Sequence, residues 1–87
     1  MLKGYVNPGF TAVADAFRRN LPVDVQGGAA RCVYYRGIPV VDIWAGSSDQ
    51  QGTPWAADTL SLSFSTTKGI VSTLLHTLAD RGEVNYD

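Results

Sequence analysis

The chain has 87 residues, a length that suits one small domain or a piece of a larger one. Its composition, 45% hydrophobic and 17% charged with a net charge of −1, is typical of a folded globular protein and argues against a disordered one. No block of Lys and Arg occurs, which argues against a nucleic-acid partner and against an anionic-membrane surface.

The chain contains one cysteine, Cys32, and one histidine, His76. A single thiol cannot form an internal disulfide, and Cys32 lies in an apolar run, so we expect it to be a small core residue. These two residues are too few for a zinc site, and we expect no metal and no cofactor. We expect His76 to be a packing or surface residue.

The N-terminus, MLKGYVNPGF, lacks a sustained apolar stretch followed by a small-residue cleavage site, so it does not look like a secretory signal peptide. No apolar run approaches the ~20 residues that span a bilayer. The sequence therefore predicts a soluble, cytoplasmic chain with no membrane partner. Nothing in it predicts the oligomeric state.

The first predicted element is a helix over residues 8–20. Asn7 suits its N-cap and Pro8 its first helical position. Pro22 is expected to stop it, and Gln26-Gly27-Gly28 to form a linker. Its core face is predicted from apolar residues at helical spacing, namely Phe10, Val13, Ala14, Phe17 and Leu21.

A hairpin is predicted next, with strands over residues 29–36 and 40–45 and a turn at residues 36–39. Asp42 could pair with Arg31 or Arg36 across it, a modest interaction. Both faces of the second strand carry large apolar groups, so we expect cover on both. Its two faces are Val41, Ile43 and Ala45 on one side and Val40, Asp42 and Trp44 on the other.

Residues 46–58 are turn-rich and polar and predict a surface loop, with Trp55 as its anchor. We expect Trp44 and Trp55 both to be core anchors. A second helix is predicted over residues 66–81 and is closed by Gly82 as the C′ glycine. Its broad apolar face predicts a central, buried helix. That face has two rows, Ile70, Leu74 and Leu78, and Val71, Leu75 and Ala79.

Helix, hairpin, loop and helix together predict the α+β class. The core of such a chain would be thin, and no terminating element follows the second helix. We therefore expect residues 1–87 to be an incomplete part of one domain, with no separate domains.

The stretch Ser65-Thr66-Thr67-Lys68 is the one candidate for chemistry. With Ser65 at the helix N-terminus, Lys68 lies about one turn later on the same face. A serine hydroxyl needs a neighbour to take its proton, and a lysine can do so when burial or nearby positive charge disfavours its charged form. The helix dipole supplies such positive charge, and backbone N–H groups there can stabilise an oxyanion.

A plainer interpretation stays open, in which Ser65 is only an N-cap and Lys68 only a solvated charge. Gly69 favours the catalytic interpretation of Ser65 and Lys68. A glycine inside a helix costs ~1 kcal/mol relative to alanine, which suggests close packing against the backbone there.

The segment WAADTLSLSFSTTKGIVSTLLHTLADRGEVNYD resembles the region around the nucleophile in serine β-lactamase-related hydrolases, closest to the family VIII carboxylesterases and class C β-lactamases. The resemblance covers roughly residues 9–87. It implies the N-terminal portion of a β-lactamase or penicillin-binding-protein-like (transpeptidase-like) fold.

The resemblance also implies that Ser65 is the acyl-accepting nucleophile, that its N–H is one oxyanion donor, and that Lys68 helps to deprotonate it. The family's tyrosine and its Lys/His-Thr-Gly-like motif have no counterpart in residues 1–87. The implied function is a carboxylesterase acting on a small-molecule ester, with this chain inactive alone. Two alternatives stay open: a β-lactamase or D-Ala-D-Ala carboxypeptidase acting on a lactam or peptide, and a non-catalytic fragment or scaffold-only relative.

Overall fold

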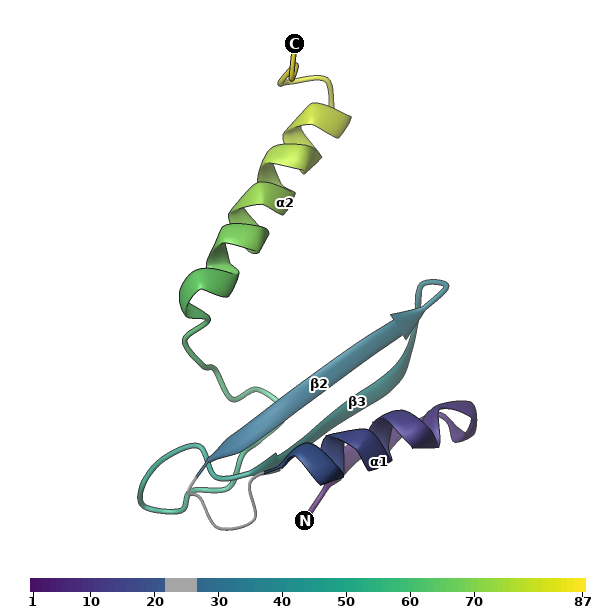
Figure 1. The fold of residues 1–87 in the computed structure, drawn as a ribbon, viewed down its shortest axis with the longest axis vertical. Helices are drawn as coiled ribbons and strands as arrows, with labels where there is room; N and C mark the ends of the chain where they lie inside the picture. The colour runs from purple at the N-terminus through teal and green to yellow at the C-terminus, as the bar shows by residue number, and fades with distance from the viewer. Residues whose placement is uncertain (22–26) are drawn as a thin grey trace.

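The computed structural model describes residues 1–21 and 27–87. Pro22 and Gln26, at the predicted helix stop and linker, lie outside these residues. The elements confirm the α+β class (Figure 1). In chain order they are β1 (Lys3–Val6), the 3₁₀ turn η1 (Pro8–Phe10), α1 (Thr11–Asn20), β2 (Gly28–Tyr35), β3 (Ile38–Gly46), the 3₁₀ turn η2 (Phe64–Thr66) and α2 (Thr67–Asp80).

The first helix is confirmed, with its opening turn in 3₁₀ form as η1. The Asn7 side-chain oxygen accepts the backbone N–H of Gly9 at 3.0 Å, so Asn7 is the N-cap that the sequence predicts. Ala14 and Phe17 on α1 are buried against the sheet. The apolar spacing therefore identified the packed face correctly.

The sheet has three antiparallel strands in the order β1-β3-β2. Strand β1 was not predicted, and Gly4 explains why. Its φ is +110°, and a Cβ there would lie 2.0 Å from the Asp42 carbonyl oxygen, so the close approach of β1 to β3 requires glycine. The residue that permits this pairing also weakens the strand signal of a four-residue segment.

The hairpin between β2 and β3 is confirmed, but its turn is tighter than predicted. Arg36 and Gly37 have φ values of +51° and +78°, as a two-residue primed turn requires. Ile38 and Pro39 belong to β3 and pair with Tyr35 and Tyr34. At the other end, Gly28 belongs to β2 and not to a linker.

A β-bulge corrects the predicted alternation of β3. Val33 pairs with Val41 and Tyr34 with Pro39, which leaves Val40 without a partner on β2. Both Val40 and Val41 are buried, at 4% and 0% exposure, although strict alternation would place them on opposite faces. The bulge thereby adds an apolar side chain to the buried face.

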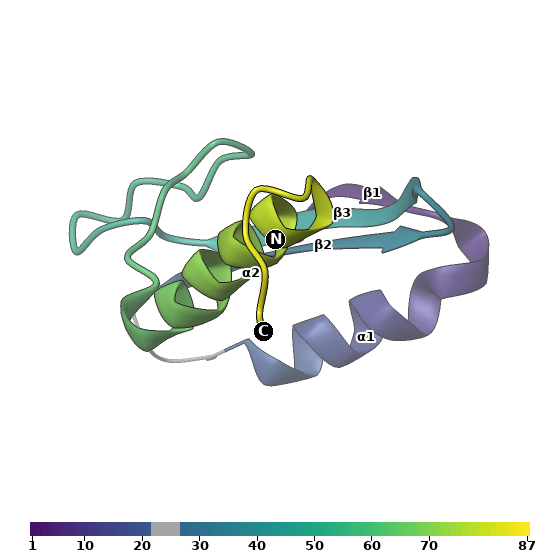
Figure 2. The same cartoon turned by 90° about the horizontal axis from the view of Figure 1, so that it is seen from above.

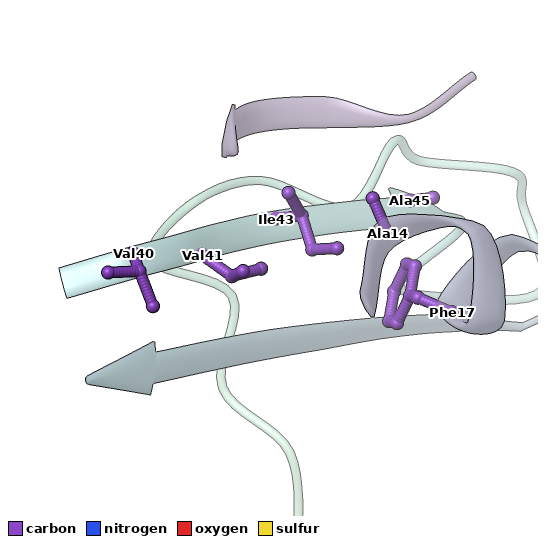
Figure 3. Packing of buried hydrophobic residues seen from close by; sticks show 6 residues of the cluster. All are labelled: Ala14, Phe17, Val40, Val41, Ile43 and Ala45. Atoms are coloured by element: carbon purple, nitrogen blue, oxygen red, sulfur yellow. The ribbon is translucent and has the colours of Figure 1, made fainter. Parts of the chain in front are cut away.

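Helix α1 covers one face of the sheet and forms the core with it (Figure 2). Figure 3 shows the six buried residues, Ala14, Phe17, Val40, Val41, Ile43 and Ala45. The expectation of cover on both faces is wrong for the described residues, because Tyr5, Cys32 and Asp42 on the other face are exposed. Cys32 is therefore not a core residue, since an apolar run does not show which face each side chain takes.

The predicted pairing of Asp42 is also wrong. Asp42 lies opposite Cys32 on β2 and Tyr5 on β1. Among residues 1–21 and 27–87, the ion pair that forms joins Arg18 and Asp15 on α1, at 3.0 Å. The register of β2 with β3, which could not be determined from the sequence spacing, places Arg31 and Arg36 away from Asp42.

The loop after β3 is ordered around Trp55, as predicted. Ser47 and Pro54 form a β-bridge, and the backbone N–H of Trp55 donates to the Gly46 carbonyl at 2.8 Å. The indole packs over Gly28, where a Cβ would lie 2.4 Å from it. Trp44 and Trp55 are half-buried, but neither belongs to the core that α1 forms with the sheet nor packs against it. The expectation that both are core anchors is therefore wrong for the described residues.

Helix α2 projects away from the sheet (Figure 1). None of its residues is buried, so the expectation of a buried helix is wrong for the described chain. Gly82, with a φ of +74°, ends α2 as predicted, and its N–H and that of Glu83 donate to Ala79 and Leu78 at 3.0 and 2.9 Å. Within the described residues, no helix is long and apolar enough to cross a membrane.

Candidate active site

Ser65 and Lys68 lie on either side of the junction between η2 and α2. Ser65 is the middle residue of η2, and Lys68 is the second residue of α2. The sequence predicted Ser65 at the start of this helix with Lys68 one turn later, and the positions of the elements agree with that. The two side chains therefore lie on neighbouring turns of one face.

The backbone immediately before Ser65 is strained. Phe64 has a φ of +47°, in the left-handed region that bulky residues rarely adopt. Such a conformation costs about 1–3 kcal/mol, and backbone strain of this kind clusters at active sites. No residue pattern around Phe64 signals this conformation, so the sequence could not have revealed it.

The N-terminal end of α2 can stabilise an anion. Because η2 continues into α2, the N–H groups of Thr66 and Thr67 already donate to the carbonyls of Ser63 and Phe64, and the Ser65 N–H lies ahead of these bonds at the N-terminal end. Ser63 and Thr66, at the N-cap positions of η2 and α2, make no side-chain capping bond, and the first turn of α2 has no acidic residue. The positive end of the dipole therefore faces Ser65 and Lys68 without a neutralising carboxylate nearby in sequence.

The described residues do not bury Ser65 and Lys68 or exclude water from them. Ser65 and Lys68 are both exposed. Apart from its chain neighbours and the backbone of its own helix, nothing in residues 1–21 and 27–87 comes within 4 Å of the position that a Cβ would take at Gly69. The expectation of close packing at Gly69 is therefore wrong for this part of the chain, and Gly69 contributes only its carbonyl, which accepts the Thr73 hydroxyl at 2.8 Å.

His76 is a surface residue, as predicted, and lies eleven residues after Ser65 along the same helix. It is too far along the axis to act as the base for Ser65. Its ring contacts two hydroxyl groups, those of Ser72 and Tyr86. The contact with Tyr86 was not predicted, because it depends on how the chain turns after α2.

Across residues 1–21 and 27–87, no three His, Cys, Asp or Glu side chains are grouped so that they could hold an ion. Ser65 and Lys68 themselves supply a hydroxyl, an amine and backbone N–H groups.

The sequence pattern of the Beta-lactamase family matches residues 17–87. The chain belongs to the beta-lactamase family. This confirms the resemblance that the Ser-x-x-Lys segment indicated, and the order of elements is consistent with the N-terminal part of a β-lactamase-like fold.

The chain is also similar to Esterase/beta-lactamase LipL of Mycobacterium tuberculosis (strain ATCC 25618 / H37Rv). The two are 45% identical over 85 residues, which is 97% of this chain and 20% of LipL. The similarity thus extends beyond the family match, over nearly the whole chain. This beta-lactamase-family chain spans about one fifth of the length of LipL.

Proposed function

We propose that the protein is a serine hydrolase of the carboxylesterase type, which forms an acyl-enzyme on Ser65 with Lys68 as its base partner. One observation carries this proposal: Ser65 lies at the positive end of α2 with Lys68 one turn away, in a beta-lactamase-family chain. The relative named Esterase/beta-lactamase LipL supports an ester as the substrate.

In the proposed reaction, the Ser65 hydroxyl oxygen attacks the carbonyl carbon of a small-molecule ester while the neutral Lys68 amine takes the hydroxyl proton. The Ser65 N–H donates to the oxyanion that forms. The alcohol leaves with that proton, and water then attacks the acyl-enzyme and releases the acid. Ser65 and Lys68 are thereby restored for a second cycle.

A β-lactam is the second candidate substrate, because the name of LipL includes both activities. The same step would open the lactam ring and leave the ring nitrogen, rather than an alcohol, to accept the proton. Ester and lactam thus differ in the leaving group and not in the roles of Ser65 and Lys68.

We further propose that residues 1–87 form an incomplete part of a single beta-lactamase-related domain and do not turn over substrate alone. The exposure of Ser65 and Lys68 supports this, since the described residues do not exclude water from the pair. Its coverage of 20% of LipL supports it as well. The 87-residue chain should therefore give no burst of nitrophenol from p-nitrophenyl butyrate; a stoichiometric burst would contradict its inactivity.

Ester hydrolysis by the whole protein to which these residues belong tests the assignment. We expect p-nitrophenyl butyrate to be hydrolysed, and Ser65→Ala to lower kcat/KM by more than ~1000-fold. Lys68→Ala should cost ~100–10,000-fold, the usual range for a missing general base. Ser61→Ala is the matched control, because Ser61 is exposed and has no lysine three residues later. Unchanged turnover in Ser65→Ala would show that Ser65 is not the nucleophile.

A further inference from the structure

The segment that follows α2, residues 83–87, folds back on the helix, and we name it the tail strap. It begins at the Gly82 turn, at the end of α2 far from the sheet (Figure 1). The Tyr86 ring meets the His76 ring edge-on, with their centroids 5.6 Å apart and their planes at 70°. Val84 is half-buried, although its neighbours in the strap are exposed. The tail strap is therefore held by side chains as well as by the turn.

His76 has a hydroxyl partner for each of its ring nitrogens. Its Nδ1 bonds to the Tyr86 hydroxyl, and its Nε2 lies 3.4 Å from the Ser72 hydroxyl oxygen. A neutral imidazole offers one donor and one acceptor, whereas a hydroxyl can do either. Both tautomers of His76 are therefore satisfied by this pair, and the contact with Ser72 fixes the plane of the ring that Tyr86 meets.

These contacts lie on the polar half of α2. Ser72 and His76 follow Lys68 at steps of four residues, so the three side chains share one face of the helix. At about 100° per residue, the row of Ile70, Leu74 and Leu78 lies on the opposite side of the helix, whereas the row that starts at Val71 borders Lys68. The tail strap thus covers the far end of the face that carries Lys68 and leaves the row of Ile70 free to pack.

We propose that His76 is a positioning residue that anchors the tail strap to α2 and so sets the direction in which the chain leaves the helix that carries Ser65. This role does not depend on acyl transfer. It makes His76 and Tyr86 one structural unit, in which Ser72 orients the imidazole and Tyr86 brings the strap to it.

Nuclear magnetic resonance of the full chain tests this unit. We expect nuclear Overhauser effects between the His76 and Tyr86 ring protons. We also expect the ¹⁵N shifts of the His76 ring to change in Tyr86→Phe, because that variant keeps the ring but removes the hydroxyl. Amide exchange at Gly82 and Glu83 should become about fivefold faster, as for one lost hydrogen bond.

Tyr5→Phe is the matched control, because Tyr5 lies on β1 and is 53% exposed. It should leave the His76 shifts and both exchange rates unchanged. Absence of the ring-to-ring effects, or equal His76 ¹⁵N shifts in Tyr86→Phe and the unaltered chain, would overturn the proposal. Since no readout uses substrate, failure here is distinct from failure of the proposed hydrolase activity.

Discussion

Asp49 organises the loop between β3 and η2. Its carboxylate accepts the backbone N–H groups of Gln51 and Thr53, each at 3.0 Å. The hydrogen bond from the Thr53 side chain, followed by those from the backbone, lowers the pKa of Asp49 below its ordinary value of 3.8. Because the folded state favours the carboxylate, this stabilisation is present above pH 3.8 and is lost as the pH falls through the lower, folded-state pKa.

We therefore predict an acid-induced loosening of this loop that depends on Asp49. The amide resonances of Gln51 and Thr53 should shift toward random-coil positions as the pH falls below 3.8. Asp49→Asn should remove this transition, and Asp58→Asn, at an exposed site in the same loop, should keep it. Identical acid transitions in the two variants would show that another group controls the loop.

Gly69 provides a second test. It lies in the first turn of α2, and apart from its chain neighbours and its own helix backbone nothing described comes within 4 Å of the position that a Cβ would take there. In the 87-residue chain, Gly69→Ala should therefore stabilise the helix by ~1 kcal/mol, as measured by thermal unfolding in circular dichroism. Gly46→Ala is the contrasting variant, because its Cβ would lie 2.3 Å from the Gly27 carbonyl oxygen and should destabilise the sheet. A loss of stability in Gly69→Ala would mean that something packs against this turn.

Among the elements, α1 and the hairpin depend on one another. Phe17, at 8% exposure, is the one large side chain that α1 buries in the core. Phe17→Ala should lower the free energy of unfolding by ~3–5 kcal/mol, enough to unfold much of so small a core. Arg19→Ala, at an exposed site two residues later, should change it by less than ~0.5 kcal/mol. Denaturant unfolding measures both, and equal effects would show that α1 does not pack as described.

An element could be predicted from the sequence where neighbouring residues determine it, and could not where pairing with a distant segment determines it. Both helices follow from local signals, namely the Asn7 cap, the apolar spacing and the Gly82 stop, and the structure confirms them. Strand β1 could not be predicted, because its partner β3 lies more than 30 residues later and Gly4 masks its strand propensity. The bulge at Val40 is likewise invisible in the sequence, since it arises from the register with β2.

The candidate site likewise has features that the sequence predicted and features that it could not predict. The spacing of Ser65 and Lys68 and their place at a helix start were predicted, and the element bounds agree. Their catalytic roles stay a prediction. The φ of Phe64 and the contact between His76 and Tyr86 depend on the path of the backbone, so no residue pattern revealed them. Burial of α2 was wrongly expected, because an amphipathic pattern shows which face is apolar and not what covers it.

The apolar half of α2 has no cover in the described chain. Its side chains, Ile70, Val71, Leu74, Leu75 and Leu78, are 36% to 61% exposed. An unpaired apolar stripe on the helix that carries Ser65 supports the proposal that these residues belong to a larger domain. Its cover would also remove water from the neighbouring Lys68.

A polar substitution at Leu74 should therefore affect the stability of the 87-residue chain and that of the whole protein differently. Leu74→Gln should change the stability of the 87-residue chain by less than ~0.5 kcal/mol, because Leu74 is 61% exposed there. In the whole protein the same change should cost ~2–4 kcal/mol, as a buried leucine does. Thr77→Gln, on the polar half, is the control and should be mild in both. Equal effects of Leu74→Gln in the two proteins would argue against a buried α2.

The central claim is that Ser65 is an acyl-accepting nucleophile, and covalent labelling tests it most directly. The whole protein is incubated with a fluorophosphonate, and its intact mass and peptide map are then measured. We expect one adduct per chain, located on Ser65, and no adduct in Ser65→Ala. A labelled Ser65→Ala protein, or an unlabelled protein that still hydrolyses p-nitrophenyl butyrate, would contradict it.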